Sequence, residues 1–185
     1  FAFSSGQLNT LFSSDWYDPK NRTATRGKMQ TDLGARYWAP LIGLFHGTRV
    51  HEAIQLIASD ISSDKGVCVI SFRKEINDLS QGIDGLEPDT KRSIGELTDV
   101  ELTKLRSVKN AATSRKVPVH PKLIELGLVE FAASRRKDGG STALLFPSSS
   151  PNRGGTAPKL GRAYEQAFLR FVRDKLGFGK GFGNH

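Results

Sequence analysis

Two charged side chains, Arg49 and Glu52, stand inside a largely apolar stretch, "GLFHGTRVHEAIQLIASDI", at residues 43–61, and Arg49 could bind an oxyanion. If this stretch is one helix with about 100° per residue, Arg49 lies within its apolar arc, Glu52 lies beside it and Gln55 lies on the polar side. A guanidinium withdrawn from water is costly unless it is paired and hydrogen-bonded. Arg49 therefore either forms a self-contained ion pair with Glu52, or points its donors at a phosphate while Glu52 holds it in place.

The other motifs indicate less chemistry. His46, His51 and Glu52 could suggest a metal site, but "HGTRVHE" lacks the His-Glu-x-x-His spacing, and we expect no metal. The stretches "GGSTALL" and "GKGFG" lack the Gly-Lys-Ser/Thr ending of a phosphate-binding loop and indicate turns. The single Cys68 excludes a disulfide framework and is typical of a core cysteine in a reducing compartment.

The charge of the chain points to the kind of partner. The 185 residues, enough for one domain, carry a net charge of +8 with a pI of about 9.8. Residues 74–101 hold three basic and eight acidic side chains, so the other 157 residues carry +13. This balance favours a polyanion such as nucleic acid, or a membrane surface, bound away from the acidic stretch. No apolar run approaches the roughly 18–20 residues that span a bilayer, and we expect no membrane segment.

The elements that must position these residues follow from the hydrophobic pattern. Helices are predicted at residues 4–12, 35–45 (with a kink or restart at Pro40), 43–61, 121–137 and 159–176, with His120 as the cap of the fourth. Strands are predicted at residues 65–74 and as a hairpin within 105–120. A short helix is expected near residues 99–107. The pattern indicates an α+β domain that is mainly helical.

Taken in order, four segments resemble the tyrosine recombinases, the phage-integrase family. Gly47, Arg49, Glu52 and Asp60 resemble the first signature box, a Gly-x-Arg-x-x-Glu core followed by an apolar stretch and an acidic residue. "VKNAATSRKVPVHPKLIELGL" resembles the next signature, and its Lys109 matches the hairpin lysine. "LFPSSS" and "GRAYEQAFLRFVRDKLGF" are similar to the strand end and the helix that lead to the second box, and the final His185 matches the first residue of its His-x-x-Arg pattern.

The resemblance implies a partial catalytic domain over residues 1–185, mainly helical with a small antiparallel sheet. It departs from the family in an acidic insertion at about 74–107, and the core-binding domain and the C-terminal tyrosine segment are absent. The family cuts and rejoins DNA through a 3′-phosphotyrosine, with no cofactor. By this resemblance Arg49 binds the phosphate, Lys109 is the general acid, His185 assists at the phosphate and Glu52 orients Arg49. This piece alone is expected to be inactive.

The expected partners are double-stranded DNA and further recombinase protomers assembled on it, in the cytosol or nucleoid of a bacterium. Six basic residues are candidates for contacts to the DNA backbone: Arg115, Arg135, Arg136, Arg153, Lys159 and Arg162. Two alternatives remain open at this point. One is a non-catalytic integrase remnant that only occupies DNA sites, and the other is a basic RNA-binding protein, in which Arg49 would matter only for folding.

Overall fold

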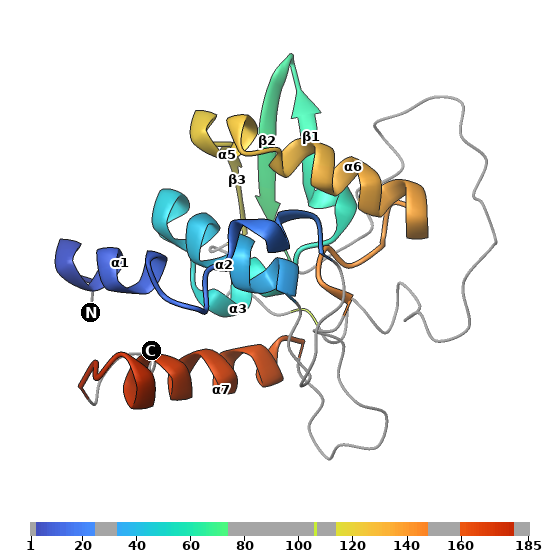
Figure 1. The fold of residues 1–185 in the computed structure, drawn as a ribbon. Helices are drawn as coiled ribbons and strands as arrows, with labels where there is room; N and C mark the ends of the chain where they lie inside the picture. The colour runs from blue at the N-terminus through green and yellow to red at the C-terminus, as the bar shows by residue number, and fades with distance from the viewer. Residues whose placement is uncertain (1–2, 25–32, 74–105, 107–113, 148–159, 180–185) are drawn as a thin grey trace.

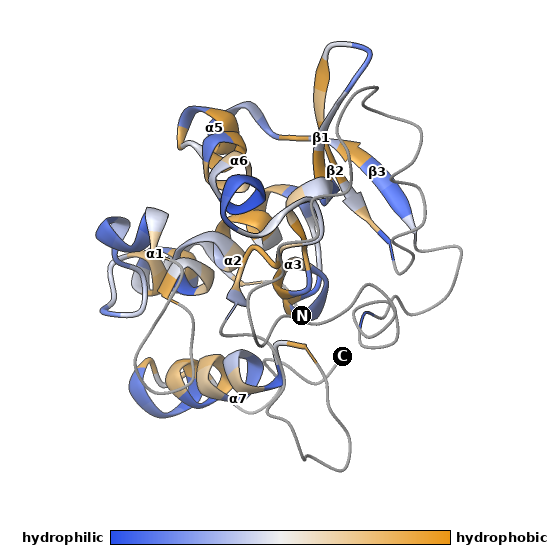
Figure 2. Cartoon of the chain, turned by 90° about the vertical axis from the view of Figure 1, so that its right-hand side faces the viewer, coloured by the Kyte–Doolittle hydropathy of each residue, from blue (hydrophilic) through white to orange (hydrophobic). Residues whose placement is uncertain are grey.

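The computed structural model describes residues 3–24, 33–73, 106, 114–147 and 160–179. Within them the chain forms a mainly helical α+β fold with one small antiparallel sheet, as the sequence predicts. Helices α2 and α3 lie at the centre, with the sheet, α5 and α6 on one side and α7 on the other (Figure 1). Hydrophobic residues gather on α2 and α3, whereas hydrophobic and hydrophilic residues alternate along α7 (Figure 2).

Helix α2, Leu33–His46, is the central element of the core. It confirms the predicted helix, but Pro40 lies in its interior and does not end it. Proline removes one backbone donor and disfavours a helix by about 3 kcal/mol. Here this penalty is offset by burial, since Trp38 and Ile42 on either side of the proline are 0% exposed. The helix ends before Gly47, whose φ of 61° takes the chain out of the helical conformation.

The predicted helix over residues 43–61 is wrong. Helix α3 covers only Val50–Ile54, preceded by Arg49 in extended conformation and followed by the 3₁₀ turn η2, Ala58–Asp60. Gln55, expected on a polar face, is 1% exposed. The segment is buried on nearly every side, and such a segment has no solvent face from which a helical period can be read.

The sheet has three antiparallel strands in the order β1-β2-β3: Ile61–Asp64, Val67–Phe72 and Arg115–Pro118. Lys65 and Gly66, with φ of 49° and 81°, form the two-residue turn between β1 and β2. Strand β2 and the second strand of the predicted hairpin are confirmed. The sequence pattern does not predict β1, because its first residue ends the apolar run that indicates the long helix. In the β2–β3 register Phe72 pairs with Arg115.

The predicted helix over residues 121–137 is divided in two. Helix α5 covers Pro121–Glu125 and α6 covers Leu128–Gly139, because Gly127 between them has a φ of 91°. His120 is the cap of α5 as expected: its Nδ1 accepts a hydrogen bond from the Lys122 N–H at 3.1 Å. Between α6 and α7, Leu144 forms an isolated antiparallel bridge with Ile57.

The two ends of the described chain pack together. Helix α1, Ser5–Phe12, and the 3₁₀ turn η1, Pro19–Thr23, precede α2, and α7, Arg162–Arg170, continues into the π-helical turn η6, Phe171–Lys175. The ring of Trp16 contacts Tyr164 and Phe168 of α7, with centroids 5.6 Å apart in both pairs. At the start of α7, a Cβ on Gly161 would meet Cγ2 of Ile54. Helix α7 therefore packs against α3 and covers this side of the core.

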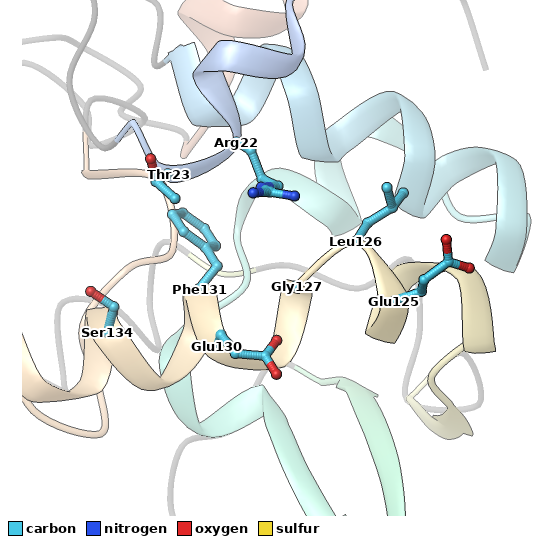
Figure 3. A pocket seen from close by; sticks show the side chains of 8 residues that line it. All are labelled: Arg22, Thr23, Glu125, Leu126, Gly127, Glu130, Phe131 and Ser134. Carbon is cyan, nitrogen blue, oxygen red and sulfur yellow. The ribbon is translucent and has the colours of Figure 1, made fainter.

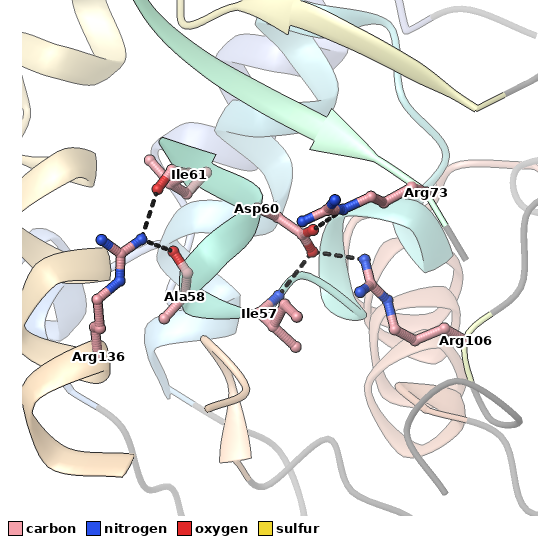
Figure 4. Close-up of polar contacts among 7 residues, drawn as sticks. All are labelled: Ile57, Ala58, Asp60, Ile61, Arg73, Arg106 and Arg136. Carbon is pink, nitrogen blue, oxygen red and sulfur yellow. Dashed lines mark hydrogen bonds and ion pairs between the residues drawn. The ribbon is translucent and has the colours of Figure 1, made fainter. Parts of the chain in front are cut away.

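Three arginines distant in sequence converge on residues 57–61 (Figure 4). The buried carboxylate of Asp60 accepts hydrogen bonds from Arg106 at 2.6 Å, from the Ile57 N–H at 3.0 Å and from Arg73 at 3.2 Å. Burial raises the pKa of Asp60, and the charge of Arg106, the Ile57 N–H and Arg73 oppose that effect. From the other side Arg136 donates to the carbonyls of Ala58 and Ile61. These bonds fix η2 and the start of β1 beneath α3.

Candidate functional site

The ends of four elements meet around Arg49. His46 is the last residue of α2, and Arg49 and Glu52 are the N-cap and the third residue of α3. Phe72 is the last residue of β2, and Arg115 is the first residue of β3. We call these five residues the arginine corner. It holds two arginines, a histidine and one carboxylate, so its net charge is positive and it is suited to an anion.

Glu52 is the buried centre of the arginine corner, with 6% of its surface exposed. Its Oε2 accepts a hydrogen bond from Nη2 of Arg115 at 3.0 Å and a longer one from the backbone N–H of Arg49 at 3.4 Å. The carboxylate thus pairs with a side chain 63 residues away, and the bond to Arg49 is one half of a helix-capping box. The self-contained ion pair between the side chains of Arg49 and Glu52 is not formed.

The side chain of Arg49 is exposed. Arg49 is the N-cap of α3, and its φ of −70° and ψ of 148° are those of extended backbone. Its side chain therefore projects from a residue ahead of the helix and does not lie within a helical apolar arc. Among the described residues its guanidinium has no hydrogen-bond or ion-pair partner. A free guanidinium keeps its planar fork of donors available, which is the geometry that binds phosphate bidentately.

Arg115 and His46 both lie beside the ring of Phe72. The guanidinium carbon of Arg115 lies 4.6 Å from the ring centre of Phe72, its register partner across the sheet. Burial lowers the pKa of His46, and the neighbouring His120 and Arg115 lower it further. His120 itself stacks on Phe45 with ring centres 4.2 Å apart.

Two buried polar atoms beside Arg49 in the chain, His46 Nε2 and Thr48 Oγ1, have no hydrogen-bond partner among the residues that the structure describes. Buried polar atoms in folded proteins are mostly bonded, so a pair of unbonded ones marks a place where a ligand or water belongs. They come from the last residue of α2 and from the short connection to α3 that carries Arg49.

The other predicted site residues are distributed unevenly. Lys109, His185, Arg153 and Lys159 lie outside the described residues, as does the expected helix near residues 99–107. Arg162 is exposed at the first residue of α7, facing solvent as a DNA contact requires.

Arg135 and Arg136, predicted to contact DNA, are instead engaged inside the protein. Arg135 is 9% exposed and donates to the Leu144 carbonyl at 3.1 Å, while Arg136 holds the carbonyls of residues 58 and 61. Both side chains lie on α6, which begins only after the break at Gly127.

The sequence pattern does not reveal the pairing of Arg115 with Glu52 or the place of His46 in the corner. It suggests the DNA backbone as the partner of Arg115, and for His46 only a metal. Nothing in the spacing of the residues signals a contact across 63 positions. The nearest hint is that Arg115 opens a strand that pairs with an apolar one, where an unpaired charge is unfavourable.

A groove of about 370 Å³ lies elsewhere, between η1 and the junction of α5 and α6 (Figure 3). Arg22 stands on one side and Glu125 and Glu130 on the other, with Phe131 and Leu126 between them. Its mixed charge, with two carboxylates, does not suit a polyanion.

Within the described ranges, no group of three or more His, Cys, Asp and Glu side chains could hold a metal ion. In the same part of the chain, no helix has the length and apolarity needed to cross a membrane. Comparisons with protein-family models, with curated proteins and with solved structures found no match for this chain.

Proposed function

We propose that this chain is part of the catalytic domain of a tyrosine recombinase, which binds double-stranded DNA and cuts and rejoins it through a 3′-phosphotyrosine. The observation that carries the proposal is the guanidinium of Arg49, which is exposed and free of protein partners within the described residues while Glu52 bonds its backbone. The order of the four motifs along the chain supports it.

The chemistry needs cations more than it needs a base. A tyrosine hydroxyl attacks the phosphorus, the P–O5′ bond breaks, the 3′-phosphotyrosine bond forms, and the released 5′-oxygen takes a proton. Negative charge grows on the nonbridging oxygens, and preorganised donors stabilise it. Arg49 is placed to donate two hydrogen bonds to these oxygens, and Lys109 is the proposed proton donor to the 5′-oxygen. The tyrosine and the second-box arginine would come from outside these 185 residues, as would the protomers that complete a synaptic complex.

The distribution of charge supports DNA as the partner. Outside residues 74–101 the chain carries +13, and helix α7 with the turn η6 displays four exposed cations. These are Arg162, Arg170, Arg173 and Lys175. Contacts of this type to the phosphate backbone give affinity without reading sequence, and they release counterions.

The test uses the full-length protein from the gene and a nicked duplex that traps the covalent adduct. We expect Arg49→Ala to reduce adduct formation by about 10²–10³-fold, the effect of losing one transition-state donor. DNA binding, measured by fluorescence anisotropy, should persist, and Arg49→Lys should recover only part of the activity because it cannot bind bidentately.

Two results would contradict the proposal. If the wild-type protein binds duplex DNA but never forms an adduct, the non-catalytic remnant is the better description. If it prefers single-stranded RNA and Arg49→Ala changes only the free energy of unfolding, the chain is a basic RNA-binding protein. Sequencing the gene beyond His185 gives an independent check, because an arginine three residues later and a tyrosine further on are expected.

A further inference from the structure

We propose that Arg115 is a positioning residue that keeps Arg49 free for the phosphate by occupying Glu52, and is not a contact to the DNA backbone. What Arg49 binds rests on the proposed function, but the coupling between Arg115, Glu52 and Arg49 rests on the structure alone. The central fact is that one oxygen, Oε2 of Glu52, accepts from both Nη2 of Arg115 and the backbone N–H of Arg49.

The side chain of Arg115 is directed inward. It is 33% exposed, its guanidinium lies over the ring of Phe72 on the neighbouring strand, and its Nη2 reaches the 8% exposed carboxylate of Glu52. An arginine that binds a DNA phosphate needs the N–H donors of its guanidinium turned to solvent. The geometry instead places the fork of Arg115 between a strand and a helix.

A buried carboxylate requires a cation, and this requirement links Arg115 to Arg49. Breaking a buried ion pair leaves an uncompensated charge that is strongly unfavourable. Without Arg115, the nearest flexible cation along the chain is the side chain of Arg49, three residues before Glu52. A guanidinium drawn onto Glu52 would no longer point its donors at an oxyanion. Arg115 therefore prevents Glu52 from competing with the substrate for Arg49.

The neighbouring residue supplies a matched control. Lys116 follows Arg115 on β3, so its side chain points to the opposite face of the sheet. It is 54% exposed and pairs with Asp64, which is 42% exposed. Replacing either residue by glutamine removes one positive charge from the same strand, yet only the change at 115 leaves Glu52 without its cation.

The experiment titrates ¹⁵N-labelled protein with inorganic phosphate at constant ionic strength and follows the side-chain and backbone N–H signals of Arg49. We expect Arg115→Gln to weaken the phosphate response of Arg49 by about tenfold, a coupling typical of residues in one ion-pair network. Lys116→Gln should leave it unchanged. The double variant Glu52→Gln/Arg115→Gln should restore most of the response, because a neutral amide does not attract the guanidinium.

A second measurement separates positioning from direct DNA contact. The slope of log K against log salt for duplex DNA becomes shallower by about 0.9 for each phosphate that the protein no longer neutralises. In an Arg49→Ala background, where Arg49 makes no phosphate contact, adding Arg115→Gln should leave this slope unchanged. If Arg115→Gln does not fold, Arg115→Lys takes its place, and a partial weakening is expected because lysine keeps the charge but not the fork.

The outcomes are distinct for the two proposals. If Arg115→Gln and Lys116→Gln weaken the phosphate response alike, or if Arg115→Gln lowers the salt slope further in the Arg49→Ala background, Arg115 is an ordinary phosphate contact and the inference is overturned. Failure of the double variant to recover the response also overturns it. If Arg49 of the wild type does not respond to phosphate, the proposed function loses its main support. The inference then depends on whether Arg115→Gln alone shifts the Arg49 side-chain signal and Glu52→Gln reverses that shift.

Discussion

Asp60 and Arg106 form an ion pair with 2.6 Å between Oδ2 and Nη2, and neither side chain is exposed to solvent. The two residues are 46 positions apart. The pair therefore ties the end of η2 to a distant part of the chain, directly behind the segment that carries Arg49.

This ion pair should contribute strongly to stability. We expect Arg106→Met to lower the free energy of unfolding by about 3–5 kcal/mol, because it removes the shortest ion pair of the buried Asp60 carboxylate and leaves it the Ile57 N–H and the longer bond to Arg73. Replacing both partners, as in Asp60→Leu/Arg106→Met, should cost less than the sum of the single changes. Urea denaturation measures all three variants. Strict additivity would show that the two side chains are not coupled.

Stability should fall in mild acid because of His46. Its pKa in the folded protein lies below the ordinary value of 6.5, owing to burial and to His120 and Arg115. As the pH falls below 6.5, the unfolded chain takes up a proton at this site and the folded chain does not, so the free energy of unfolding decreases. We expect His46→Asn to lose less stability than the wild type between about pH 7.5 and 5. An identical decrease in both proteins would show that the loss of stability in acid comes from residues other than His46.

The start of α7 should not tolerate a side chain at residue 161. Gly161 has a φ of 74°, and a Cβ there would meet Ile54 of α3. We expect Gly161→Ala to destabilise the fold by about 2–4 kcal/mol, the sum of backbone strain and overpacking. Gly177→Ala is the control, since its φ of 68° is also positive but nothing lies within 4 Å of the added carbon. Thermal unfolding should show a clearly smaller loss for the control.

Arg162 and Arg136 should respond in opposite ways, although both are predicted DNA contacts. Arg136→Gln removes the bonds to the carbonyls of residues 58 and 61 and should reduce stability while leaving the salt slope of DNA binding unchanged. Arg162→Gln should leave stability unchanged and reduce the slope by about 0.9 if it contacts one phosphate. Anisotropy titrations at several salt concentrations measure the slopes. A reversed pattern would mean that Arg136 opens toward the DNA.

The sequence predicts those elements whose pattern is local. Helix α2 and strand β2 have a clear apolar pattern, and His120 with Pro121 marks the start of α5. The prediction of a long helix through Arg49 is wrong because residues 52–61 are all buried, so no polar face marks a 3.6-residue period there. Gly47 and Gly127 break helices through positive φ angles, and their sequence context does not distinguish them from glycines within a helix.

The candidate site is predictable from the sequence only in part. Arg49 and Glu52 stand out because charges within an apolar stretch need a partner, but the identity of that partner depends on the fold. Glu52 meets Arg115 only because β3 pairs with β2 and brings its first residue against α3. Arg136 is a second example. Its positive charge suggests a DNA contact, but from α6 its side chain donates hydrogen bonds to the carbonyls of residues 58 and 61.

Asp60 binds Arg73 on one side and Arg106 on the other, and these arginines stand at the two ends of residues 74–105. A single carboxylate therefore holds two arginines that are far apart in the sequence. Asp60 thus acts as a clasp: replacing this one carboxylate would release Arg73 and Arg106 together.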